Sequence, residues 1–306
     1  MTAEAPGATR EPVTPQPSAP ETGAVPIEPL DAAVQESDTP GTRDIELAVE
    51  IAAPIDAVWR AITEGELVAN WFAPVASAQP GEGGHLTVSW GAGAEWTSWI
   101  TKWDPGRHLR LVDQLPEKAG DTAAVMALDY RLTDPGATRL DLVNSGLSSA
   151  PDWDDTFHMM QNGWRFFLWN LKHFLERHPG ATRTMISERP WVAGSREEVW
   201  DRVFGANGLV DTIADGAYPA TGDRFRCVLD GLEPLEGIAV LCDRPWAFAG
   251  VMSSLNDGVL HVEMEGTGER WKLGVWLSAY GVGEEPCAEI GAALARTVSR
   301  VFPEDG

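Results

Sequence analysis

Histidine, cysteine and carboxylate side chains are the residues that could bind a metal ion, and the chain has six histidines and three cysteines. His173, Glu176 and His178 lie close together near the end of a predicted helix. A zinc-protease helix needs two histidines four residues apart, with a glutamate directly after the first. The spacing here differs, and the cysteines form no Cys-x-x-Cys motif. The sequence therefore predicts no metal site and no cofactor, and we interpret the histidine cluster as polar surface.

Glu95, Asp113 and His158 are the titratable residues that could act as a catalytic acid or base, and all three are weak candidates. Such a group must point into a cavity and have a shifted pKa. Asp113 shares the face of an alternating stretch with Leu109 and Leu111, and His158 lies one residue away from an aromatic stripe. The alternative is that Asp113 caps a strand at the rim and His158 hydrogen-bonds a loop. The sequence has no Gly-x-Ser-x-Gly nucleophile motif, so an enzyme is the less favoured interpretation.

Aromatic and sulfur-containing side chains gather in stretches that a sheet and a long helix would bring together. Over residues 152–178, apolar residues recur mostly at steps of three and four, which is typical of one face of a helix. Apolar walls with few polar groups are typical of small-molecule pockets. The same side chains could instead fill a core, because each Trp or Phe buries roughly 150–250 Å². The predicted ligand-binding residues are Trp71, Phe72, Trp90, Trp99, Phe157, Met160, Trp164 and Phe167.

The chain has 306 residues and a formal net charge of −23, with 46 acidic and 23 basic side chains. This charge argues against nucleic-acid binding, which needs a basic footprint, and against docking on an anionic membrane. The sequence has no run of about 18 apolar residues that could span a membrane. Residues 1–15 lack the basic and apolar segments of a secretion signal. Because three cysteines are no disulfide framework, we expect a cytoplasmic protein.

Length and composition predict a tail followed by two domains. Residues 1–42 hold eight of the 22 prolines and no aromatic residue, and their acids outnumber their bases seven to one. Such a segment cannot bury enough apolar surface to offset the entropy of ordering it. We expect a disordered acidic tail, which is either a solvated tether or an element that recruits a partner. The two domains are expected over residues 43–180 and 181–306.

Residues 43–180 have the pattern of an α+β domain. Alternation of polar and apolar residues over 44–51 and 124–132 is typical of half-buried strands. Pro54 suits the first turn of a helix over Ile55–Thr63. Runs of strands bounded by helices indicate a sheet wrapped on a helix. The remaining expected elements are a helix over 66–72, strands over 85–90, 95–103, 107–114, 122–133 and 138–144, and a long helix over 152–178.

The same order of elements restarts after residue 180. Glu198–Phe204 aligns with Ala57–Thr63, so that two Val-Trp pairs lie 141 residues apart. Ser195 and Glu198 resemble a capping box at the start of that helix. The final helix, expected over 286–302, is much less aromatic than its counterpart in the first domain. The order predicts a divergent second copy, with strands over 182–191, 224–229, 236–241, 246–252, 259–265 and 271–280.

Three motifs stand out in the first domain. They are Ala53-Pro54-x4-Trp59-x2-Ile62-Thr63, Leu67-x3-Trp71-Phe72-Ala73-Pro74 and Gly163-Trp164-x2-Phe167-Leu168-x-Asn170-Leu171-Lys172-x2-Leu175-Glu176. Together they resemble the SRPBCC (START-like) superfamily, and within it the heat-shock-protein ATPase activator-like, or Aha-type, domain. The resemblance covers residues 43–178 and extends over 182–304 by element order alone. Trp169 departs from the last motif, where a small residue is more usual, and the second copy lacks that motif.

This resemblance implies tandem helix-grip domains, each a curved antiparallel sheet wrapped on a long C-terminal helix around an apolar cavity. We therefore expect the first domain to bind a hydrophobic small molecule. Two alternatives stay open: a cyclase or hydrolase that uses the same cavity, and a co-chaperone-like module that activates a heat-shock ATPase. No nucleic acid or membrane is expected as a partner, and a protein partner could use the acidic tail or the second domain.

Overall fold

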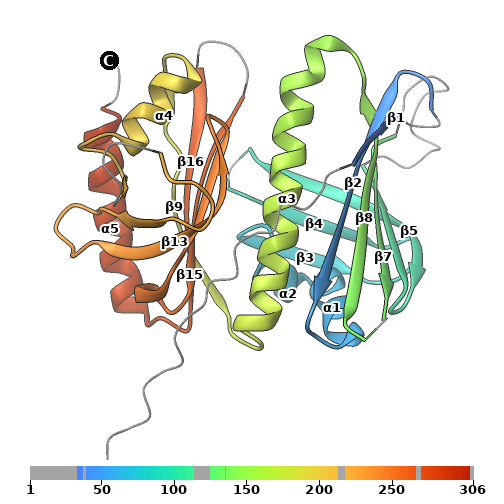
Figure 1. Ribbon diagram of the computed structural model, residues 1–306. Coiled ribbons are helices and arrows are strands. Elements are labelled where there is room, and N and C mark those ends of the chain that lie inside the picture. Colours follow the sequence, from blue (N-terminus) through green and yellow to red (C-terminus); the bar gives the residue numbers. More distant parts are fainter. Residues whose placement is uncertain are drawn as a thin grey trace, which may run out of the picture.

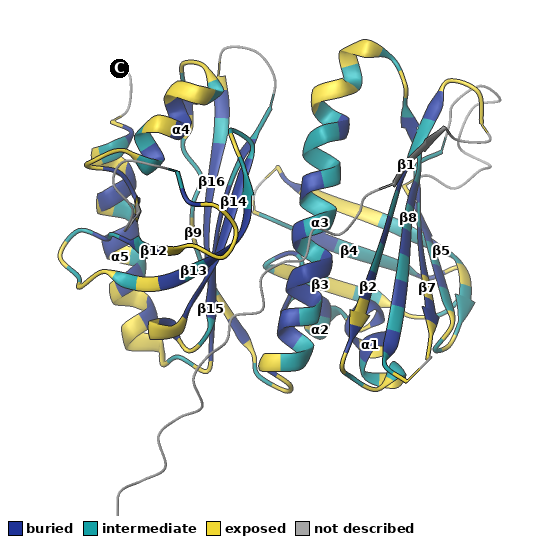
Figure 2. Ribbon diagram, in the orientation of Figure 1, coloured by how far each residue is buried: buried dark blue, intermediate teal, exposed yellow. Residues whose placement is uncertain are grey.

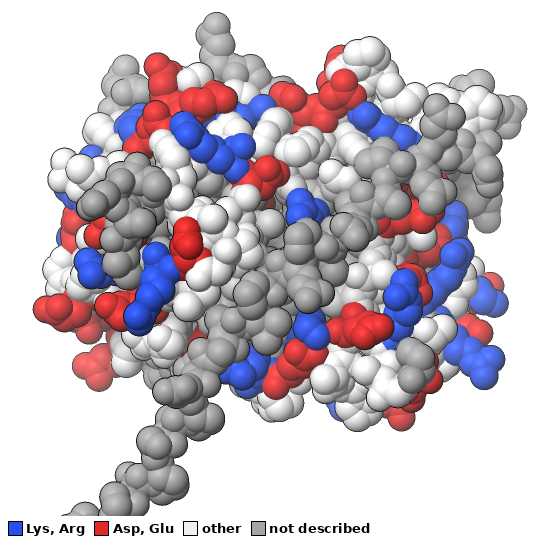
Figure 3. All heavy atoms as spheres, viewed as in Figure 1, with Lys and Arg blue, Asp and Glu red and all other residues white. Residues whose placement is uncertain are grey.

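A computed structural model describes residues 33–36, 39–91, 93–113, 125–134, 136–212, 218–266 and 270–303 of the protein. It consists of two antiparallel sheets with helices (Figure 1), which confirms the predicted α+β class. No helix among the described residues is long and apolar enough to cross a membrane. Acidic and basic side chains are interspersed over the face drawn in Figure 3.

The predicted tail, residues 1–42, lies outside the described residues except near its end. There β1 (Ala33–Glu36) pairs antiparallel with β2 (Thr42–Ile51). This strand corrects the expectation that disorder extends to residue 42. Backbone N–H and C=O groups along an open sheet edge can pair with any extended segment, whatever its side chains. The polar composition of the segment therefore gives no sign of the strand.

The first unit is an eight-stranded sheet with the order β1-β2-β8-β7-β6-β5-β4-β3. The predicted helix over Ile55–Thr63 is confirmed as α1, whereas α2 (Gly65–Val68) is shorter than expected. Strand β3 (Val75–Gln79) was not predicted, because its small and polar residues at a sheet edge show no apolar alternation. The other elements are β4 (His85–Ser89), β5 (Glu95–Asp104), β6 (His108–Val112), β7 (Ala127–Thr133), β8 (Thr138–Ser148) and α3 (Asp154–Arg177).

The second unit repeats this strand order. Its sheet runs β10-β16-β15-β14-β13-β12-β11, with β9 also paired to β16. When β9 and β10 are taken as the counterpart of β2, each later strand occupies the place of its equivalent in the first sheet. The predicted capping box is present at α4 (Arg196–Phe204), where Ser195 and Glu198 exchange hydrogen bonds.

The bounds of the second unit agree closely with the predicted segments, with two exceptions. The single strand expected over 182–191 ends at Glu188 and is followed by a separate strand, β10, and the short strand β11 was not predicted. The bounds are β9 (Arg183–Glu188), β10 (Trp191–Ala193), β11 (Val210–Thr212), β12 (Arg224–Cys227), β13 (Leu235–Asp243), β14 (Ala247–Met252), β15 (Gly258–Glu265), β16 (Arg270–Tyr280) and α5 (Glu284–Val301).

Helix α3 lies between the two sheets (Figure 1). One face of α3 packs into the core of the first unit through Phe157, Leu168 and Phe174. Its opposite face packs on β13, β14 and β15 through Phe166 and Trp169. The second sheet is therefore covered on both faces, by α5 and by α3, and its strands are largely buried (Figure 2).

The position of Trp169 explains its departure from the family motif. Its side chain is 6% exposed and belongs to the cluster that α3 forms with Val240, Ala249 and Val259 of the second sheet. A small residue suits a helix whose outer face meets solvent. Here that face meets a second sheet, and a large apolar side chain fills the space between them.

Several histidines are buried in the same interface. The ring of His261 on β15 stacks on Phe166 with 3.7 Å between ring centroids. His173 on α3 stacks on Trp169 at 4.9 Å and hydrogen-bonds the backbone oxygen of Asp257 through Nε2. Burial lowers the pKa of His261 to about 3 and that of His173 to about 4. Both rings are therefore neutral in the folded protein at neutral pH.

These histidines make the stability of the protein depend on pH. An unfolded histidine has a pKa of about 6.5, so below that pH the unfolded chain binds protons that the folded chain does not. We expect the contribution of these histidines to the free energy of unfolding to be fully present above pH 7. It should fall by up to about 1.4 kcal/mol per pH unit for each such histidine as the pH drops toward the folded pKa. Urea titrations between pH 7.5 and pH 5 measure this slope.

The variant His261→Phe keeps a ring on Phe166 and removes one titrating group, so its slope should be shallower than that of the wild type. His85→Phe is the matched control, because His85 lies on β4 away from the interface, with its ring 5.6 Å from Trp99. An unchanged slope in His261→Phe would show that this histidine is not protonated differently in the two states.

Candidate functional site

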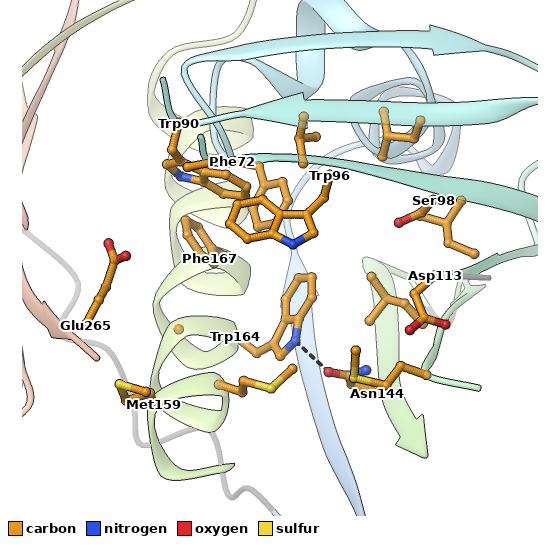
Figure 4. Close-up of a pocket in the computed structure, with 18 of the residues that line it drawn as sticks. Phe72, Trp90, Trp96, Ser98, Asp113, Asn144, Met159, Trp164, Phe167 and Glu265 are labelled. Atoms are coloured by element: carbon orange, nitrogen blue, oxygen red, sulfur yellow. Dashed lines mark hydrogen bonds between the residues drawn. The ribbon is translucent and has the colours of Figure 1, made fainter. Parts of the chain in front are cut away.

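A cavity of about 590 Å³ lies between α3 and strands β4–β8 of the first sheet (Figure 4). Its wall is mainly aromatic and aliphatic, and the second unit contributes residues at one end. The first unit contributes Phe72, Leu86, Val88, Trp90, Ala94, Trp96, Ser98, Leu111, Val112, Asp113, Met126, Ala127, Leu128, Tyr130, Asn144, Met159, Met160, Gly163, Trp164 and Phe167. The second unit contributes Arg189, Glu263, Glu265 and Gly266.

Phe72 is the centre of the aromatic part of the wall. Its ring stacks on Trp164 at 5.5 Å and meets the edges of Phe167 at 4.5 Å and Trp90 at 5.0 Å. Trp96 extends the cluster toward solvent, with its ring 5.5 Å from Trp90 and 58% of the residue exposed. Segments that are far apart in the chain thus form one aromatic surface (Figure 4).

Asn144 holds Trp164 in this surface. The indole Nε1 of Trp164 donates to Oδ1 of Asn144 at 3.1 Å, which Figure 4 marks. The amide Nδ2 of Asn144 in turn donates to the backbone oxygen of Ala127 at 3.1 Å. The indole N–H is therefore satisfied within the wall, and the ring presents carbon atoms to the cavity.

Five of the predicted ligand-binding residues line the cavity, namely Phe72, Trp90, Met160, Trp164 and Phe167. Trp71 does not: it is 1% exposed, and its Nε1 donates to the backbone oxygen of Ala61 at 2.8 Å. Phe157 does not either, because it is buried beneath the guanidinium of Arg43, 4.0 Å from its ring centroid. These two side chains belong to the core of the first unit.

Trp99 is the third predicted residue that does not line the cavity. Side chains alternate along a strand, and on β5 Trp96 and Ser98 line the cavity. Trp99 therefore points to the other face, where its ring lies 5.6 Å from His85. The alternation of β5 could have identified Trp96 in place of Trp99 from the sequence.

The weak catalytic candidates have different positions. Asp113 follows β6 and lines the cavity. His158 does not line it: its Nε2 lies 3.1 Å from the Asp243 carboxylate of the second unit, and its ring lies 4.5 Å from Trp246. Glu95 is exposed at the start of β5. Of these residues only Asp113 can contact a molecule in the cavity.

The second unit borders one end of the cavity with a cluster of charged side chains that the sequence did not reveal. Arg189 donates to both carboxylate oxygens of Glu265, at 2.6 and 2.8 Å, and to the backbone oxygen of Trp90 at 3.1 Å. Beside this pair, Nε1 of Trp276 donates to Oε1 of Glu263 at 2.9 Å. Burial, aided by the charge of Glu265, raises the pKa of Glu263 to about 8. Nothing in the sequence relates these residues to a cavity in the first unit.

The expectation that the histidines near the end of α3 form a polar surface cluster was wrong, because His173 and His178 are 8% and 6% exposed. His173 and His178 both face the backbone oxygen of Asp257, whereas Glu176 accepts from Lys172 and from the backbone N–H of Ala52. Among the described residues, no three His, Cys, Asp or Glu side chains come together as a metal site.

Residues 52–176 match the family described as activator of Hsp90 ATPase homolog 1-like protein. Among solved structures, the chain is similar to DynU16 from the dynemicin biosynthetic locus, with 20% identity, a TM-score of 0.36, and coverage of 84% of this chain and 96% of that one. CalU16 from Micromonospora echinospora has 22% identity, a TM-score of 0.39, and coverage of 49% and 85%. Aha1 from Colwellia psychrerythraea, solved as a dimer, has 19% identity, a TM-score of 0.38, and coverage of 45% and 98%. No curated protein matches the chain.

The role of Asn144 in the wall can be measured. Asn144 is 5% exposed, so Asn144→Ala leaves the Trp164 indole N–H and the Ala127 carbonyl without their partner. We expect a loss of about 2 kcal/mol in the free energy of unfolding and a weaker near-UV circular dichroism signal from tryptophan. Asn207→Ala, at an exposed loop position, is the control and should change neither quantity. Equal effects of the two substitutions would contradict the role given to Asn144.

Proposed function

We propose that the protein binds a hydrophobic small molecule between α3 and the first sheet, and that residues 52–176, which match the activator of Hsp90 ATPase homolog 1-like family, form an Aha-type domain of the SRPBCC superfamily. The observation that carries the proposal is the cavity of about 590 Å³ with its aromatic wall. Sites for small molecules have volumes of roughly 300–1,000 Å³ and few polar groups. A cavity of this size, bounded by satisfied aromatic side chains, suits an apolar molecule of drug-like dimensions.

The packing of the aromatic residues supports ligand binding over simple filling of the core. Core side chains pack at the density of organic crystals and leave few voids larger than a water molecule. Trp71 and Phe157 fill the core in this way, at 1% and 6% exposure. Phe72, Trp164 and Phe167 pack against one another and still border open space. This space is the proposed ligand site.

The second unit has a supporting part in this proposal. Its sheet packs on the outer face of α3, and Arg189 of the second unit holds the backbone of Trp90 in the cavity wall. A unit with this placement positions the helix and closes one end of the cavity. We therefore assign the second unit to the ligand site, and the boundaries at residues 43–180 and 181–306 remain our proposed domain division.

Two other uses of the domain make different predictions. The family description names activation of an Hsp90 ATPase, which would require contact with a chaperone and no cavity. An enzyme of the cyclase or hydrolase type would require a titratable group in contact with the substrate. We favour binding because the cavity and its wall are the features of the first unit that such an activator would not need.

The proposal is tested by binding of neutral aromatic probes, such as 2-acetylnaphthalene and Nile red, followed by tryptophan fluorescence and thermal shift. Ser98→Phe places a ring in the cavity, and Thr97→Phe is the matched control, because Thr97 is the exposed neighbour on the opposite face of β5. We expect Ser98→Phe to weaken probe binding at least tenfold and Thr97→Phe to leave it unchanged.

Absence of binding to the wild-type protein, or equal binding by both variants, would overturn the proposal. The same preparations can be added to the heat-shock ATPase of the source organism. Stimulated ATP hydrolysis that is equal in the wild type and Ser98→Phe would favour the co-chaperone function instead.

A further inference from the structure

We propose that Glu263 of the second unit donates a hydrogen bond to a neutral oxygen acceptor, such as a ketone or quinone carbonyl, on the ligand in the cavity. The inference rests on the proposed function and goes beyond it, because it names the chemical class of the ligand and makes the site a product of both units. Three observations support it. The side chain of Glu263 on β15 faces the first unit, α3 has a glycine where the cavity passes it, and the hydrogen-bonding partners of Glu263 leave an oxygen available.

The pairing of β15 directs Glu263 toward the first unit. Leu260, Val262 and Met264 pack in the core between the second sheet and α5. The alternate residues Val259 and His261 instead contact α3. Glu263 continues this second face, and its side chain borders the cavity.

Gly163 provides the gap in α3. It lines the cavity, and a Cβ atom placed on it would have only Cε2 of Phe167, at 3.8 Å, within 4 Å outside the local helix backbone. Because Gly163 has no side chain, the cavity continues past the helix toward the second unit. Figure 4 shows Glu265 on one side of α3 and Asp113 and Asn144 on the other. A ligand that lies against Trp164 can therefore reach the second sheet.

Burial and the charge of Glu265 favour the protonated form of Glu263, and they outweigh the opposite effects of Trp276 and Arg189 on its pKa. Arg189, the cation beside it, is engaged by both oxygens of Glu265, and Trp276 supplies a single N–H to Oε1 of Glu263. Burial and the nearby charge of Glu265 raise the pKa of Glu263 to about 8, so the carboxyl is mostly neutral at pH 7. A neutral carboxyl has one O–H donor to offer.

The other charged or titratable groups around the site do not change this assignment. The α3 residues that line the cavity have no titratable side chain, and Arg165 on α3 hydrogen-bonds Asn162. His261 on β15 is neutral, because burial lowers its pKa to about 3. Asp113 lies across the cavity on the first sheet. An O–H donor at one end of a mainly apolar cavity selects an apolar ligand that carries an acceptor.

The test compares two probes of similar shape, 2-acetylnaphthalene, which has a carbonyl, and 2-isopropylnaphthalene, which has no acceptor. At pH 6.5 the wild type should prefer the carbonyl probe by about tenfold, which is the effect of one hydrogen bond. This preference should disappear at pH 9.5, because the O–H donor is lost as the pH rises through about 8. Neither probe titrates in this range.

Two variants separate the donor from the charge. Glu263→Gln keeps an N–H donor at every pH, so it should retain the carbonyl preference at both pH 6.5 and pH 9.5. Glu263→Leu should lose the preference at both pH values and still bind 2-isopropylnaphthalene, which shows that the cavity is intact. Glu285→Gln, an exposed position at the start of α5, should behave as the wild type.

Equal binding of both probes by the wild type at pH 6.5 would overturn this inference and leave the proposed function standing. Failure of both probes to bind would overturn the proposed function itself. A preference that is lost in Glu263→Gln, or that persists in Glu263→Leu, would exclude Glu263 as the donor.

Discussion

The burial of α3 on both of its faces is the constraint on which the rest of the structure depends. A helix that packs one apolar stripe against a sheet normally leaves its opposite face to water. Here Phe166 and Trp169 on that opposite face contact a second sheet. Two sheets with the same strand order are thereby held on a single helix, and each unit forms part of the surroundings of the other.

This arrangement determines which side chains line the cavity and how polar each end of it is. The first sheet and α3 supply an apolar, aromatic wall in which the polar atoms of Trp164 and Asn144 satisfy each other. The polar residues at the other end, Arg189, Glu263 and Glu265, all come from the second unit. Because Glu263 lies in the contact between the units, burial and the charge of Glu265 raise its pKa. The chemistry of the cavity is therefore divided between the two units.

Because the two units share this interface, the stability of each unit depends on the same contacts. His261 and His173 are buried where α3 meets the second sheet, and burial lowers the pKa of each. Neutral stacked histidines suit an interface of aromatic rings, since a charged imidazolium there would lose its hydration. The helix that borders the ligand cavity is thus held in place by contacts that acid weakens.

By itself, the sequence determined the elements and their order. The helix over Ile55–Thr63, the capping box at Ser195 and the long helix α3 follow from local spacing and local hydrogen bonding, which neighbouring residues decide. The same kind of signal identified Phe72, Trp164 and Phe167 as parts of the wall. It misplaced Trp99, although the alternation along β5 puts Trp96 on the cavity face. It also missed β1, β3, β10 and β11, which lie at sheet edges and are stabilised by pairing there.

Only the tertiary structure decided which faces of these elements meet. Periodicity shows that a helix has an apolar stripe, but it does not show that the remaining face will be covered, as Trp169 is. Likewise, no local pattern relates Glu263 to Trp164, because about a hundred residues separate them in the chain and they line one cavity only after both sheets have packed on α3. Contacts between residues distant in sequence depend on the packing of whole elements, and for this reason the second unit's part in the site could be found only in three dimensions.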